Sequence, residues 1–155
     1  MKNKLTSKEY VVAAGSALAV FLSDQLAKWL VISYGPKELI PGFLGFRIHY
    51  NTGIALSIPL GSWMIVLLMI VAFFLVTRMF LQAFRAGRRF SVLAYGLLLG
   101  GALSNIVDRV RVGAVIDYVE IANTSIFNIA DTAIIIGLVL FFWMNWKRVS
   151  QAPKV

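Results

Sequence analysis

The chain has 155 residues, of which 59% are hydrophobic and 14% are charged, and its formal net charge is +8. A soluble domain averages about 45 to 50% apolar and about 25% charged residues. This composition leaves too few polar residues to cover a water-soluble globule, so it indicates a membrane protein of one domain. A basic excess is also typical of nucleic-acid binding, and the positions of the charges must decide between the two.

The sequence contains no cysteine and a single histidine, His49. The absence of cysteine excludes disulfides, thiolate metal sites, iron–sulfur clusters and cysteine nucleophiles. A single histidine cannot build a multi-histidine zinc site, although a mixed histidine and carboxylate site remains formally open. We expect no metal and no other cofactor. The role of His49 stays open, with a packed surface position favoured over a catalytic one.

Four apolar stretches are long enough to cross a bilayer core about 30 Å thick, which needs about 20 helical residues. They cover residues 10–33, 61–82, 90–110 and 128–146. We therefore predict an all-α polytopic membrane protein with four transmembrane helices. The first stretch has an alternative as a cleaved signal peptide, because basic residues precede it. Asp24 and Lys28 within the stretch disfavour that alternative.

The basic residues lie mainly in the N-terminal segment, around the connection between the second and third stretches, and in the tail. These segments hold Lys2, Lys4, Lys8, Arg78, Arg85, Arg88, Arg89, Lys147, Arg148 and Lys154, against Glu9 alone. The other two connections are neutral overall. Basic loops remain cytoplasmic, so both termini are predicted inside and residues 34–60 and 111–127 outside. The net charge is thus a topology signal, and no nucleic-acid partner is expected.

The two outer segments carry strand-like patterns. Residues 43–50 are rich in aromatic and β-branched side chains between turn residues, which predicts one or two short strands. Residues 116–121 alternate, which places Asp117, Val119 and Ile121 on one side of an extended segment. We expect a small extracytoplasmic β-rich layer, centred on residues 34–60, within a single domain spanning residues 1–155.

Acidic residues are scarce, yet Asp24, Asp108, Asp117 and Asp131 lie within or beside the predicted spans. An ionised carboxylate at mid-bilayer costs about 2.5 to 3.5 kcal/mol on insertion scales, so each needs a partner or a function. Asp24 and Lys28 are four residues apart with the acid first, which favours a structural ion pair.

The third stretch contains small residues at four-residue steps from Gly96 to Ser104, a pattern that favours close helix packing. It leads into Asn105, Asp108 and Arg109, which share one helical face at the outer end of the span. Two interpretations remain open for these three residues. They either close the helix end by hydrogen bonds or bind a substrate.

The fourth stretch begins with Asn128, a favourable N-cap, and Asp131 follows three residues later as in a shortened capping box. Asp117 lies only 14 residues before Asp131, on a segment that must return to the membrane surface. Two carboxyl groups in contact share a proton and supply the general base and general acid that amide hydrolysis requires. We predict an aspartic dyad that needs no metal, with Asn and Arg side chains holding the peptide around it.

Four motifs in this order resemble the lipoprotein signal peptidases, also called signal peptidase II, over nearly the whole chain. The motifs are Asp24-Gln25-Leu26-Ala27-Lys28, Asn51-Thr52-Gly53-Ile54-Ala55-Leu56-Ser57, Asn105-Ile106-Val107-Asp108-Arg109 followed by Gly113-Ala114-Val115-Ile116-Asp117-Tyr118, and Phe127-Asn128-Ile129-Ala130-Asp131. Ser104, Leu56 and the short return between Asp117 and Asn128 depart from the usual family pattern.

The resemblance implies a membrane-embedded aspartic endopeptidase of the bacterial cytoplasmic membrane. It would cleave prolipoproteins just before a diacylglyceryl-modified cysteine at the outer face, and globomycin would inhibit it. The implied catalytic residues are Asp117 and Asp131, and the implied substrate-binding residues are Asn51, Asn105, Arg109 and Asn128. Structural support is expected from Asp24, Lys28, Gly53 and Asp108. We expect a working monomer whose partners are lipid-modified prolipoproteins and membrane lipids.

Two alternatives belong to other classes. The intramembrane carboxylates could form a proton or ion relay in a small transporter subunit, which predicts inverted repeats or broken helices around a midplane site. The glycine stripe alone would fit a noncatalytic assembly subunit. Neither repeats nor a midplane cluster of acids is visible in the sequence.

Overall fold

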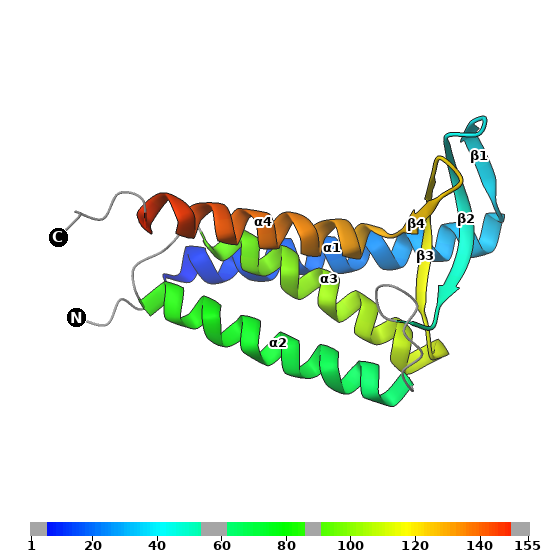
Figure 1. Cartoon of the computed structure of the whole chain (residues 1–155). Coiled ribbons are helices and arrows are strands. Elements are labelled where there is room, and N and C mark those ends of the chain that lie inside the picture. The colour runs from blue at the N-terminus through cyan, green and yellow to red at the C-terminus, as the bar shows by residue number, and fades with distance from the viewer. Residues whose placement is uncertain (1–5, 54–61, 86–90, 150–155) are drawn as a thin grey trace.

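The computed structural model describes residues 6–53, 62–85 and 91–149. Four helices run side by side: α1 (Ser7–Tyr34), α2 (Ser62–Arg85), α3 (Ser91–Val112) and α4 (Ile129–Val149). A small sheet lies across one end of this bundle (Figure 1). The C-terminal ends of α2 and α4 both lie at the opposite end. The helices coincide with the predicted apolar stretches to within about three residues, so the mainly helical class is confirmed.

The sheet contains β1 (Lys37–Ile40), β2 (Leu44–Asn51), β3 (Val115–Ile121) and β4 (Ser125–Phe127), in that spatial order and all antiparallel. The predicted strands at 43–50 and 116–121 correspond to β2 and β3. The sequence patterns did not indicate β1 or β4. The expected small β-rich layer is present, and β1 and β4 make it wider than the two predicted strands.

One helix, α1, is long and apolar enough as a whole to cross a membrane, with a mean hydropathy of 1.4 over its best window. Shorter apolar runs lie in α2, over Leu67–Gln82, and in α4, over Ile129–Trp143. These findings cover the described residues only. The first helix remains continuous through Asp24 and Lys28, which lie buried on its inner side.

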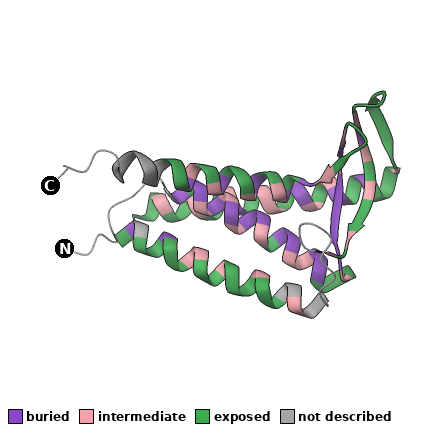
Figure 2. Ribbon diagram, viewed as in Figure 1, coloured by how far each residue is buried: buried purple, intermediate pink, exposed green. Residues whose placement is uncertain are grey.

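The centre of the bundle is α3, and its small residues face both neighbouring helices. A Cβ atom on Gly100 would meet the carbonyl oxygen of Ala17 in α1, and one on Gly101 would lie 2.5 Å from the carbonyl oxygen of Ala130 in α4. The packing role predicted for the small-residue stripe is therefore confirmed. Buried positions concentrate along α3, whereas α2 exposes most of its surface (Figure 2).

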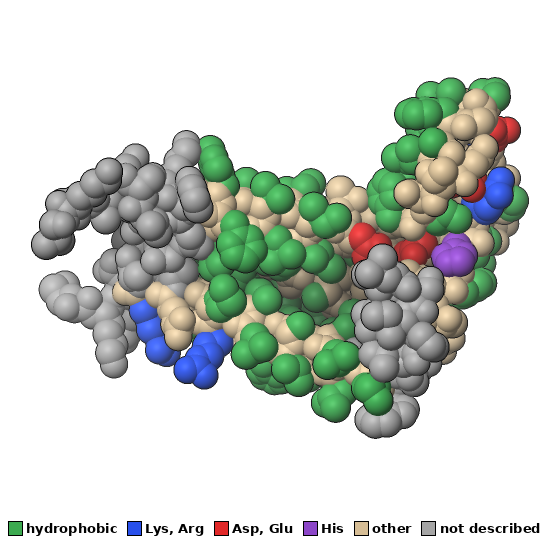
Figure 3. Space-filling model, viewed as in Figure 1, with side chains coloured by type: hydrophobic (Ala, Val, Ile, Leu, Met, Phe, Trp, Pro, Cys, Tyr) green, Lys and Arg blue, Asp and Glu red, His purple; other side chains and the backbone are tan. Residues whose placement is uncertain are grey.

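The end of the bundle remote from the sheet has an apolar core. Phe80 of α2 contacts Tyr95 of α3 and Phe141 of α4, with ring centroids 4.9 and 4.5 Å apart. Large apolar side chains cover the outer faces of the helices, as Figure 3 shows. The sheet end differs sharply, because its interior is polar.

Candidate active site

Polar and charged side chains are buried where the bundle meets the sheet. They are Asp24, Lys28, Ser104, Asn105, Asp108, Arg109, Asp117 and Asn128. Leaving one buried polar group without a partner costs about 1 to 3 kcal/mol, so such a cluster persists only when its members bond to one another. On the visible face of the molecule, acidic side chains gather at this junction beside the histidine (Figure 3).

Asp117 lies in β3 and accepts a hydrogen bond on each carboxylate oxygen. Asn51 Nδ2 donates to Oδ2 over 3.1 Å, and Asn128 Nδ2 donates to Oδ1 over 2.7 Å. Burial raises the pKa of Asp117 to about 6; the Asn51 and Asn128 donors oppose this rise, and the negative charge of Asp131 adds to it. The site therefore holds a carboxyl group that titrates near pH 6. A pKa shifted this far is typical of functional groups.

A β-bulge determines which β2 side chains reach Asp117. Phe46 pairs with Val119 but His49 pairs with Asp117, so three steps along β2 match two along β3. A one-residue shift moves every later side chain to the opposite face of the sheet. The bulge thus brings His49 and Asn51 to the face that carries Asp117. His49 is exposed there, which agrees with the predicted surface position, although its neighbour across the ladder was not foreseen.

Asn128 links the two predicted catalytic residues. Its Nδ2 donates to Asp117, and its Oδ1 accepts the backbone N–H of Asp131 over 2.7 Å, which confirms Asn128 as the N-cap of α4. The Asp131 carboxylate accepts a hydrogen bond from Asn105 Nδ2 of α3 over 2.8 Å. This bond joins α3 to α4. In the capping-box interpretation the Asp131 carboxylate would bond within the first turn of α4. The structure therefore joins all four residues in one hydrogen-bonded cluster.

Arg109 borders the same cluster. Its Nη2 donates to the backbone oxygen of Gly53 over 2.7 Å, and Gly53 N donates to Asn51 Oδ1 over 3.2 Å. The Arg109 side chain is buried, yet within the described residues its Nε and Nη1 have no hydrogen-bond partner. Two unpaired guanidinium donors beside two aspartates are suited to bind a carbonyl or carboxylate oxygen.

The predicted Asp24–Lys28 ion pair is present and belongs to a larger buried network. Lys28 Nζ lies 2.5 Å from Asp24 Oδ2 and 2.6 Å from Asp108 Oδ2. Ser104 Oγ donates to Asp24 Oδ2 over 2.6 Å, and Ile116 N donates to Asp108 Oδ2 over 3.1 Å. This network ties α1, α3 and β3 together directly behind the acids of the site.

The three polar residues at the outer end of α3 thus have different partners. Asn105 bonds to Asp131, Asp108 pairs with Lys28, and Arg109 reaches Gly53. Asp108 therefore holds the fold together, while Asn105 and Arg109 border the two acids, and substrate binding by these two residues stays a prediction.

Two further polar residues of this region lie within the family motifs, but the sequence analysis assigned them no role. Tyr118 Oη donates to Asp24 Oδ1 over 3.1 Å and accepts Ile129 N over 3.2 Å. Gln25 Nε2 donates to Ser104 Oγ and Asp108 Oδ1 over 2.9 and 3.0 Å. The available signal for Tyr118 was its position directly after Asp117, since a buried tyrosine hydroxyl usually has a partner.

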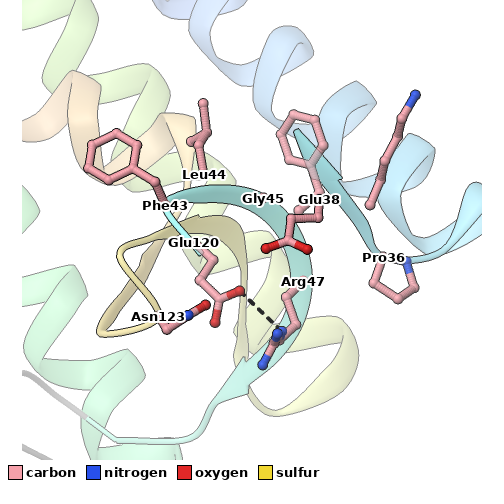
Figure 4. Close-up of a pocket in the computed structure, with 10 residues that line it drawn as sticks. Pro36, Glu38, Phe43, Leu44, Gly45, Arg47, Glu120 and Asn123 are labelled. Atoms are coloured by element: carbon pink, nitrogen blue, oxygen red, sulfur yellow. Dashed lines mark ion pairs between the residues drawn. The ribbon is translucent and has the colours of Figure 1, made fainter. Parts of the chain in front are cut away.

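A separate hollow of about 190 Å³ lies on the sheet between β1, β2 and β3. Arg47 pairs there with Glu120 over 3.1 Å, and Figure 4 shows both side chains with Glu38 and Asn123 around the hollow. Tyr118 and Glu120 alternate with Asp117 along β3, so this hollow and the Asp117 carboxylate occupy opposite faces of the strand. Across the described residues, no group of three His, Cys, Asp or Glu side chains is placed to hold a metal ion.

Fold and site together define a helical membrane enzyme with a polar site at one end of its bundle, and solved structures of that class agree. One bacterial membrane enzyme, determined by the in meso method at 2.3 Å, has a TM-score of 0.80 and 27% sequence identity, covering 99% of this chain and 96% of the other. A second, at 1.9 Å, has a TM-score of 0.73 and 26% identity, covering 100% and 99%.

Sequence comparison identifies the family. The sequence model described as signal peptidase (SPase) II matches residues 16–147. A lipoprotein signal peptidase of Listeria monocytogenes serotype 4b (strain CLIP80459) is 37% identical over 132 residues, 79% of this chain and 85% of the relative. The lipoprotein signal peptidase of Anoxybacillus flavithermus is 35% identical over 143 residues, 87% and 85% of the two chains. The chain belongs to the signal peptidase II family, so it is a peptidase of a membrane enzyme family and the predicted family is confirmed.

Proposed function

We propose that this chain removes the signal peptide from bacterial prolipoproteins and cleaves just before a diacylglyceryl-modified cysteine. The names of its relatives support lipoprotein signal peptides as the substrate class. An active site at the end of an apolar bundle suits a substrate whose cleavage site is held at the membrane surface by its lipid. The same family membership disfavours the transporter and assembly-subunit alternatives.

One observation supports the catalytic assignment most directly. Asp117 and Asp131 come from different elements, yet Asn128 bonds to the carboxylate of one and to the backbone of the other. The charge of Asp131 also contributes to the raised pKa of Asp117. Two carboxyl groups that influence each other share a proton and titrate as a unit, as an acid–base pair requires.

The proposed reaction is a hydrolysis in two steps. The ionised carboxylate takes a proton from water, whose oxygen bonds to the scissile carbonyl carbon while the protonated carboxyl group gives its proton to the carbonyl oxygen. The carboxyl group that took the proton then donates it to the leaving nitrogen, and the other carboxylate takes a proton from the diol as the C–N bond breaks. The products are a carboxylic acid and a free amino group, and the pair again holds one proton. No metal takes part in this scheme.

Substrate binding is assigned to the polar side chains that border the two acids. Among the described residues two donors of Arg109 have no partner, and they are offered to peptide oxygens. Asn51, Asn105 and Asn128 donate to the two carboxylates and so hold them in orientation. Asp24, Lys28, Gly53 and Asp108 support these residues from behind. We propose a working monomer.

We also propose that all four helices cross the bacterial cytoplasmic membrane. Each carries large exposed apolar side chains, among them Leu22 of α1, Phe74 of α2, Leu93 of α3 and Val139 of α4. Bilayer lipid is the environment in which such surfaces are stable. The basic segments then lie in the cytoplasm and the sheet on the outer face.

The test is cleavage of a diacylglyceryl-modified prolipoprotein peptide by the purified chain in detergent or bilayers. Asp117→Asn and Asp131→Asn are each expected to lower kcat by about 10²- to 10⁴-fold, because each removes one partner of the acid–base pair. Wild-type turnover is expected to be unchanged by a chelator, and the peptide without its lipid is expected to be cleaved poorly.

Glu120→Gln is the matched control, since it removes a carboxylate from the same strand but from the opposite face. It should retain wild-type turnover. Full activity in either aspartate variant would refute the dyad. Reversible loss of activity on chelation would refute the metal-free reaction, and equal cleavage of both peptides would refute the lipid-dependent substrate.

A further inference from the structure

The buried hydroxyl of Tyr118 connects the two elements that carry the proposed catalytic acids. Its oxygen accepts the backbone N–H of Ile129, the first residue of α4, over 3.2 Å. It also donates to Asp24 Oδ1 over 3.1 Å, and the side chain is 1% exposed. We propose that Tyr118 is a positioning residue: its hydroxyl fixes the first turn of α4 against β3 and so sets the spacing of Asp117 and Asp131. This inference rests on the proposed function.

Strand geometry explains how β3 carries both the proposed catalytic acid Asp117 and the positioning residue Tyr118. Consecutive residues of a β-strand point to opposite faces, so Asp117 and Tyr118 diverge from adjacent positions on β3. Asp117 meets Asn51 and Asn128 on one face, and Tyr118 meets Asp24 and Ile129 on the other. The hydroxyl therefore does not contact the reacting groups and acts on them only through the backbone.

The first turn of α4 has four backbone N–H groups without partners inside the helix, as every helix does. The Asn128 side chain satisfies one of them, the N–H of Asp131, and its carbonyl accepts the first intrahelical bond, from Thr132 N. Two others find partners outside the helix: Ile129 N bonds to Tyr118, and Ala130 N bonds to Asp24 Oδ1 over 3.1 Å. Because Tyr118 and Asp24 also bond to each other, these contacts fix both the rotation and the height of the turn that carries Asp131.

The tyrosine is a fixed hydrogen-bonding group. Burial, reinforced by the negative charge of Asp24, holds the pKa of Tyr118 well above its usual range. Its hydroxyl therefore does not titrate in the range around pH 6 in which Asp117 does. A pH effect seen on removing it would have to come from the carboxyl groups that it positions.

The test compares Tyr118→Phe with Tyr95→Phe. Tyr95 is the matched control, because its hydroxyl also bonds within the bundle, to Thr77 over 3.2 Å, but at the apolar end. Tyr118→Phe is expected to lower kcat by about 10- to 100-fold, since small misplacements of catalytic groups have effects of that order. Its KM should stay within about twofold of wild type. Its pH–rate profile should shift, because the coupling of two carboxyl groups depends on their separation.

Hydrogen exchange at Ile129 and thermal unfolding accompany the assay. Tyr118→Phe should speed exchange at that amide while the protein remains folded, and Tyr95→Phe should leave kcat, pH profile and this amide unchanged. A wild-type kcat and pH profile in Tyr118→Phe would overturn the proposal. So would loss of the folded state, or equal kcat losses in both variants without a pH shift.

Asp117→Asn, measured in the same assay, separates the two hypotheses. If Asp117→Asn is inactive and Tyr118→Phe is fully active, the positioning role fails and the proposed function stands. If Asp117→Asn is fully active, the dyad itself is wrong.

Discussion

The protonation of Asp117 depends on burial that the unfolded chain lacks. An aspartate in an unfolded chain titrates near about 3.9, whereas burial raises the pKa of Asp117 in the folded protein to about 6. The folded protein therefore binds this proton more tightly than the unfolded chain. The stabilisation is fully present below about pH 3.9 and is lost as the pH rises through about 6.

Asp117→Asn removes this proton linkage. The melting temperature of the variant relative to wild type is therefore expected to rise between about pH 4 and pH 7, whatever the constant effect of the new amide group. Thermal unfolding in detergent over this pH range measures the difference. Glu38→Gln, which removes a carboxylate from the exposed strand β1, is the control. Parallel curves for Asp117→Asn and wild type would contradict the raised pKa.

At the residue scale, the types and spacing of side chains predicted most members of the polar cluster. Asp24 and Lys28 pair as expected, Asn105 donates to the Asp131 carboxylate, and Asn128 donates to the Asp117 carboxylate. The contact of Tyr118 was not predictable in the same way. Its hydroxyl, on β3, meets the Asp24 carboxylate only for one rotation and one axial position of α1 and α4. No local pattern in the sequence specifies these.

At the scale of elements, α3 combines close packing with polar bonding on one helix. Gly100 lets it approach the backbone of α1, and Ser104, one turn further on, donates to Asp24 of the same helix. Close approach is what brings so short a side chain within bonding distance of its partner. The small residue at 104 is therefore both a packing residue and a hydrogen-bond donor.

Gly100→Ala is expected to destabilise the protein by about 1 to 3 kcal/mol, because its methyl group would overlap the carbonyl oxygen of Ala17. Gly15→Ala in α1 is the matched control. A Cβ atom there would meet nothing within 4 Å, and alanine is favoured over glycine in a helix by about 0.5 to 1 kcal/mol. Reversible unfolding in detergent would measure both changes. Equal stabilities for the two variants would show that the α1–α3 contact is looser than described.

Elements were predictable in proportion to their length. The helices are long apolar runs, so their positions followed from composition. The strands β1 and β4 have four and three residues, too few for an alternating pattern to stand out. The bulge in β2 also left no local signal, although it decides that Asn51 faces Asp117.

At the scale of the molecule, opposite ends of one bundle have opposite chemistry. Aromatic contacts fill the end near Phe80 and Phe141, and ion pairs and amides fill the end that meets the sheet. A buried polar network needs hydrogen bonds and ion pairs among its members to be stable. The sheet meets this need by bringing Asp117 and Tyr118 against the ends of the helices, so the same contacts that close the fold also assemble the site.

The orientation of this asymmetric molecule in the membrane is testable with single cysteines, because the natural sequence has none. Arg85 is exposed at the end of α2 remote from the sheet, and Asn123 is exposed in the turn between β3 and β4. Basic segments remain cytoplasmic, so Asn123→Cys should react with an impermeant maleimide from outside spheroplasts. Arg85→Cys should react only in inverted vesicles or after permeabilisation. Labelling of both positions from the same side would rule out the arrangement in which the carboxylates face the outer surface.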